Sequence, residues 1–148
     1  MIHAQVETAR ITGKINWGRV VLCGIVSGVV WTVLSSLITA LLAKDFVVAV
    51  PGGRLSKPPA GFVAFLFMVA LMMGIWAMWL YAAIRPRYGP GAKTAAITGL
   101  SWWAISSCVD ATWGSFGFVA PSAVLPASAA SLPALIIAAM VGAWLYRE

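Results

Sequence analysis

The sequence predicts an all-α integral membrane protein, a bundle of four transmembrane helices with both termini in the cytoplasm. Of its 148 residues, 61% are apolar and 9% are charged, whereas an average soluble domain is roughly 45–50% apolar and about 25% charged. A soluble chain this short keeps too large a share of its surface in water to hide so many apolar side chains. The charges also lie at the ends of long apolar runs. We therefore expect a single transmembrane domain over residues 1–148.

The first two helices are predicted by two apolar runs that contain no charge. Residues 20–43 form a run of 24 residues, and residues 58–84 form a run of 27. Crossing a hydrocarbon core takes roughly 20 helical residues. We expect spans at 18–43 and 60–84. The Pro and Gly residues of the segment RPRYGPG are expected to stop the second span and to make a tight connection to the third.

The last two helices share one long stretch. Residues 94–146 number 53 and carry a single charge, Asp110, which is too long for one span and suits two. We expect helices at 92–115 and 124–146, joined where Gly, Pro and Ser collect. Pro126 is then the first residue of the fourth helix, and Pro133 lies two turns inside it and kinks it.

The distribution of basic residues predicts the orientation. The ten Lys and Arg residues divide between the two sides of the predicted bundle as seven against three. The seven are Arg10, Lys14, Arg19, Arg85, Arg87, Lys93 and Arg147, and the three are Lys44, Arg54 and Lys57. Because cytoplasmic loops carry the excess of basic residues, both termini and the loop between the second and third helices are expected inside.

Asp110 is the only acidic residue inside an apolar run. An intramembrane acid is a candidate proton relay or cation ligand. It lies 17 residues after Lys93, which places it roughly 25 Å across a core of about 30 Å. We therefore expect it near the outer headgroups, where a structural or interfacial role competes with transport chemistry.

Two further pairs are candidates for packing and lipid contact. Gly24 and Gly28 lie four residues apart in the first helix, a spacing that lets two helix backbones approach closely. Arg85 and Arg87 lie in the predicted cytoplasmic loop, where each basic residue adds roughly 1 kcal/mol of attraction to anionic lipid headgroups.

No residue pattern predicts catalysis. The single histidine, His3, lies outside the predicted spans, so the commonest ligand for haem and membrane metal sites is missing from them. We expect no catalytic, cofactor or metal site, while contacts with pigment, quinone or lipid stay open. The basic residues do not form one face or stripe, so nucleic acid is not an expected partner.

The segment WLYAAIRPRYGPGAKTAAITGL and the ending GAWLYRE resemble a group of small, uncharacterised bacterial four-span membrane proteins. The resemblance covers the second and third spans, their loop and the C-terminus. It implies a four-span topology with the IRPRYGPG loop as its signature, and it implies no activity or ligand.

Together these patterns favour a non-catalytic accessory subunit of a larger membrane complex, such as a photosynthetic or respiratory assembly. The expected location is the bacterial inner membrane, and the expected partners are the bilayer, its anionic headgroups and other membrane subunits. The alternative is a small transporter or channel in which Asp110 couples to a proton or cation.

Overall fold

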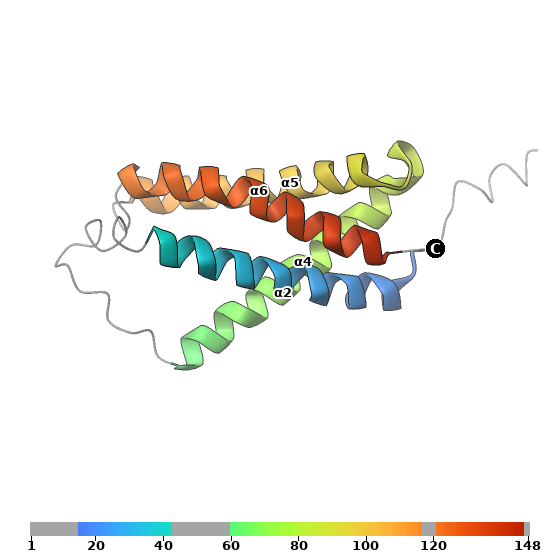
Figure 1. The fold of residues 1–148 in the computed structure, drawn as a ribbon, viewed down its shortest axis with the longest axis horizontal. Coiled ribbons are helices and arrows are strands. Elements are labelled where there is room, and N and C mark those ends of the chain that lie inside the picture. Colours follow the sequence, from blue (N-terminus) through green and yellow to red (C-terminus); the bar gives the residue numbers. More distant parts are fainter. Residues whose placement is uncertain (1–14, 43–59, 117–120, 147–148) are drawn as a thin grey trace, which may run out of the picture.

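The computed structural model describes residues 15–42, 60–116 and 121–146, and nearly all of them are helical. The four helices are α2 (Trp17–Leu41), α4 (Ala60–Tyr88), α5 (Ala92–Ser115) and α6 (Pro121–Leu145). In Figure 1, α5 and α6 run side by side, and α4 crosses α2 obliquely. The prediction of an all-helical fold with four helices is confirmed.

Three of the four helices are long and apolar enough to cross a membrane. They are α2, the Gly61–Tyr88 part of α4 and the Ser122–Leu145 part of α6. Large apolar side chains cover their outer surfaces, including Leu22, Phe65 and Leu125. Lipid is the natural surrounding for such a surface, because water would penalise so large an exposed apolar area. The chain is therefore a membrane protein.

The helix boundaries correct three of the expectations. α4 continues through Pro86 to Tyr88 instead of stopping at residue 84. Pro86 has no N–H for the carbonyl of Ala82, so α4 continues past it with one backbone hydrogen bond fewer. The helix ends at Gly89, which adopts a φ of 80° and donates its N–H to the carbonyl of Arg85 at 2.9 Å.

The fourth helix begins at Pro121 rather than at residue 124, so Pro126 and Pro133 both lie inside it. Pro133 has no N–H for the carbonyl of Ala129. The neighbouring carbonyl of Ser128 accepts bonds from Trp103 Nε1 at 2.8 Å and from Ser131 Oγ at 2.8 Å. Side-chain donors from α5 and α6 thus bond to the backbone around the proline, as membrane helices require.

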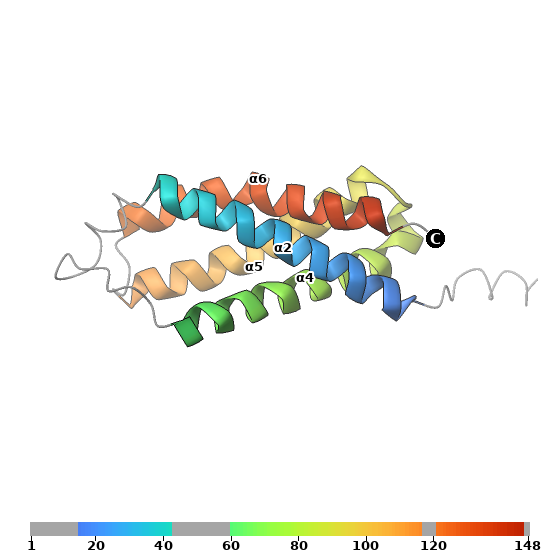
Figure 2. The same ribbon diagram turned by 60° about the horizontal axis from the view of Figure 1, so that its bottom comes forward.

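The core lies where all four helices meet, in the half of the bundle nearer the α4–α5 connection. Its fully buried side chains include Val20, Met78 and Leu135. Ser27 Oγ donates to the carbonyl of Ala138 at 2.9 Å and joins α2 to α6. Figure 2 shows α2 and α6 running together along one side of the bundle. We call the end at which α4 connects to α5 the turn end.

The crossing of α2 and α4 depends on three glycines. A Cβ atom added at Gly28 would lie 2.8 Å from the Cα of Leu71, and one added at Gly74 would lie 2.6 Å from the nitrogen of Gly28. A Cβ at Gly24 would overlap the backbone of Ile75. The two backbones are therefore in direct contact, which only residues without a Cβ permit.

We expect Gly74→Ala to destabilise the bundle by about 1–3 kcal/mol, because the added methyl group meets backbone atoms that cannot move aside. Gly61→Ala is the matched control, since a Cβ there meets nothing within 4 Å. Thermal unfolding in detergent should show a lower Tm for Gly74→Ala and an unchanged or higher Tm for Gly61→Ala. Equal Tm values for the two variants would contradict the backbone contact.

Candidate functional site

The predicted pair Gly24 and Gly28 forms half of the closest helix contact in the bundle. Its counterpart on α4 is Gly74, together with the backbone of Ala70, whose carbonyl would lie 2.7 Å from a Cβ at Gly28. We missed this counterpart in the sequence. The small residues Ala70 and Gly74 lie four apart, and this spacing was the signal that could have identified it.

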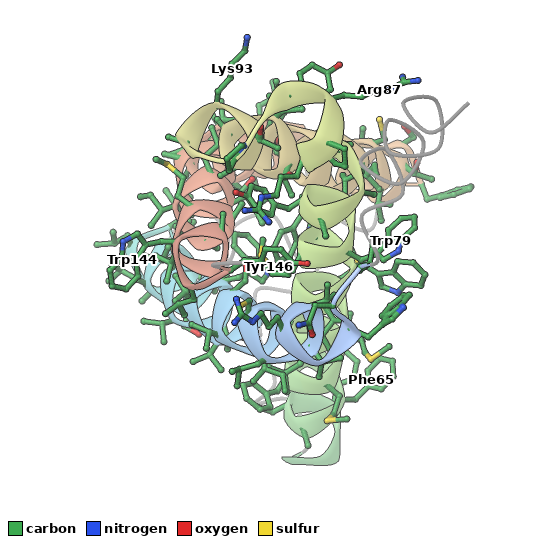
Figure 3. All side chains as sticks on the ribbon, turned by 90° about the vertical axis from the view of Figure 1, so that its right-hand side faces the viewer. Phe65, Trp79, Arg87, Lys93, Trp144 and Tyr146 are labelled. Carbon is green, nitrogen blue, oxygen red and sulfur yellow. The ribbon has the colours of Figure 1, made fainter. Side chains whose placement is uncertain are left out.

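Arg85 and Arg87 lie in the last turn of α4 and not in a loop as the sequence predicts, and the two differ in their surroundings. Arg85 is half-buried, and its guanidinium lies 5.6 Å from the centre of the Tyr146 ring. Arg87 is exposed and points away from the bundle at the turn end, as Figure 3 shows. The predicted basic pair therefore divides into one arginine that contacts the C-terminal end of α6 and one on the surface.

Two aromatic side chains pack together near Arg85 at the turn end. The rings of Tyr81 and Tyr146 meet edge to face with centroids 5.8 Å apart, and both tyrosines are buried. The hydroxyl of Tyr81 accepts the N–H of Gly91 at 3.2 Å. Figure 3 shows Tyr146 pointing into the middle of the bundle. These contacts join α4, the start of α5 and the end of α6.

The short connection between α4 and α5 is also stabilised by a hydrogen bond from the first turn of α5. Gly91 adopts a φ of 129°, a conformation that side-chain-bearing residues rarely take. Thr94 Oγ1 donates to the carbonyl of Gly89 at 2.6 Å. The predicted role of the glycines in a tight connection is therefore confirmed, and Thr94 is an additional contributor that the sequence analysis did not identify.

Asp110 lies in the half of α5 away from the turn end, where it and its neighbours Cys108 and Val109 are exposed. The structure does not bring it together with Arg85 or Arg87. Ser107, three residues earlier, instead shares a hydrogen bond of 2.7 Å with Ser128 of α6. Within the described ranges, no group of three His, Cys, Asp or Glu side chains is placed to hold a metal ion.

Trp31, Trp102 and Trp103 pack between helices near the middle of the bundle. The rings of Trp31 on α2 and Trp102 on α5 have centroids 6.0 Å apart. Trp102 is buried, and Trp103 bonds to α6. These rings therefore pack internally and do not offer a flat outer face.

One stretch of α4 has no packing partner within the described chain. Every residue from 61 to 69 is exposed, although the segment is apolar throughout. It includes Phe62, Phe65 and Met68, and the first two rings stack with centroids 6.5 Å apart. We call residues 61–69 the α4 arm. In Figure 1 it forms the pale green start of α4, extending away from the other helices.

We expect Arg85→Gln to lower the stability of the bundle by about 0.5–2 kcal/mol, because it removes the cation from the face of the Tyr146 ring. Arg87→Gln removes the same charge from an exposed position and should leave stability unchanged. Thermal unfolding of the two purified variants measures the difference. The same Tm for both would show that Arg85 does not stabilise the turn end.

No family model, curated protein or solved structure matches the chain. The functional proposal therefore depends on the geometry described above.

Proposed function

We propose that the protein is a non-catalytic, four-span subunit of a larger complex in the bacterial inner membrane, and that it binds its partner through the α4 arm. The observation that carries the proposal is the arm itself, which is exposed on every side. The glycine crossing directs the arm away from the bundle. The chain thus presents a long apolar helix surface that its own described helices do not use.

Packing physics favours a protein partner at this surface. Helices in lipid gain no hydrophobic energy by associating, so they associate through van der Waals contacts and hydrogen bonds. A helix that crosses its neighbour at one point makes such contacts over only part of its length. The exposed side chains of the α4 arm are free to make such contacts with another protein. Its Phe and Met side chains are of the kinds enriched at protein interfaces.

Hydrogen bonds within α5 support the proposal of four spans. α5 is the least apolar of the four helices and is not among the three that qualify as spans by composition. Its hydroxyl groups nevertheless bond to its own backbone: Thr98 to the carbonyl of Thr94 at 3.0 Å, and Ser101 to that of Ile97 at 2.9 Å. Groups satisfied in this way cost less in lipid than free hydroxyls.

The basic residues support the orientation. All four basic residues in the described part of the chain lie near the turn end. They are Arg19, Arg85, Arg87 and Lys93. The positive-inside rule assigns such an end to the cytoplasm. Both termini then lie on the cytoplasmic side.

Purification in a gentle detergent tests the subunit role. We expect the protein to elute from size exclusion with at least one other membrane protein. Replacing Phe62 and Phe65 by Ala should reduce the retained partner about tenfold or more, because buried aromatic anchors dominate interface energies. The matched control replaces Val33 and Leu37 by Ala, which are exposed on α2.

Both double variants should keep the Tm of the unaltered protein, because none of the four side chains is buried in the bundle. A protein that always elutes alone contradicts the subunit role. Loss of the partner in the α2 variant but not in the arm variant contradicts the arm as the binding surface.

Thiol labelling tests the orientation. In a background of Cys23→Ala and Cys108→Ala, we expect Gly52→Cys to react with an impermeant reagent on intact cells. Tyr88→Cys, at the exposed end of α4, should react only after the membrane is permeabilised. The reverse pattern would contradict the count of basic residues.

A further inference from the structure

A half-open groove of about 370 Å³ lies at the turn end between the start of α5 and the end of α6. Its volume falls within the range of roughly 300–1,000 Å³ that is typical of small-molecule sites. The residues that line it are Tyr81, Gly91, Ala92, Ala95, Met140, Val141, Ala143 and Trp144. The lining is almost entirely apolar.

The lining offers two polar side-chain groups, the Tyr81 hydroxyl and the Trp144 indole N–H. The Tyr81 oxygen accepts the N–H of Gly91 at 3.2 Å. An occupant with many polar groups would lose its bonds to water on entering and would regain few of them. The groove is therefore suited to a hydrocarbon chain.

The cations of the described residues lie at the same end of the bundle as the groove, and one of them, Lys93, lies next to it in sequence. The described residues place four cations near the turn end, whereas their one acid, Asp110, belongs to the other half of α5. Lys93 is exposed in the first turn of α5, between the groove residues Ala92 and Ala95. Figure 3 shows Lys93 and Trp144 extending outward from neighbouring helices at this end.

We propose that the groove binds one acyl chain of an anionic phospholipid, whose phosphate pairs with Lys93. The bilayer supplies this ligand beside the groove, and basic pockets between transmembrane helices on the cytoplasmic side are suited to anionic lipid. Trp144 stands at the edge of the groove, where an amphipathic ring favours the boundary between chain and head group. The inference requires the membrane location and does not depend on the subunit role.

Native mass spectrometry of the purified protein tests the proposal, with phosphatidylglycerol and phosphatidylcholine as probes. We expect one phosphatidylglycerol to be retained in preference to phosphatidylcholine. Ala92→Phe should lower its retention about tenfold or more by filling the groove. The matched control is Ala104→Phe, at an exposed position on the same helix outside the groove.

The head group is tested separately. Lys93→Gln should reduce retention of phosphatidylglycerol about fivefold, the equivalent of roughly 1 kcal/mol per basic residue, and leave that of phosphatidylcholine unchanged. Arg19→Gln, an exposed cation on α2, should retain both lipids as the unaltered protein does. Thermal unfolding establishes that each variant is folded. Equal retention of the two lipids by the unaltered protein, or equal losses in the two Phe variants, would overturn the proposal.

Discussion

Gly24, Gly28 and Gly74 let the backbones of α2 and α4 touch, and the course of α4 depends on that contact. A side chain at any of these positions would collide with the backbone of the other helix and push α2 and α4 apart. With the glycines in place, the second half of α4 enters the core through Met78 and Tyr81, while its first half leaves the bundle as the α4 arm. The same crossing thus brings one half of α4 into the packed turn end and leaves the other half exposed.

The helices could be predicted from the sequence because length and hydropathy are local properties. Uninterrupted apolar runs identified α2 and α4, and the pair Gly24 and Gly28 indicated close packing. Which helix packs against Gly24 and Gly28 depends on tertiary geometry. The spacing of the small residues Ala70 and Gly74 nevertheless indicates α4 as the partner. Helix ends are less predictable, because proline is typical of a boundary and yet Pro86 and Pro126 both lie inside helices.

The turn end could not be predicted, because its contacts join residues that are far apart in the chain. The whole of α5 and of α6 lies between Tyr81 and Tyr146 in the chain, and their edge-to-face contact arises only once α4 and α6 pack together. Tyr81 also accepts a hydrogen bond from Gly91, so the same residue joins α4 to the end of α6 and holds the connection between α4 and α5 in place.

The hydrogen bonds around Ser128 bear on how the chain is made. Trp103 donates to its carbonyl and Ser107 shares a bond with its hydroxyl, so two polar groups of α5 find partners only on α6. A helix with these groups unpaired enters hydrocarbon at a higher cost than a uniformly apolar one. In the proposed four-span topology, α5 therefore enters the bilayer at a lower cost together with α6 than on its own. The bonds to Ser128 thus favour insertion of α5 and α6 as one hairpin.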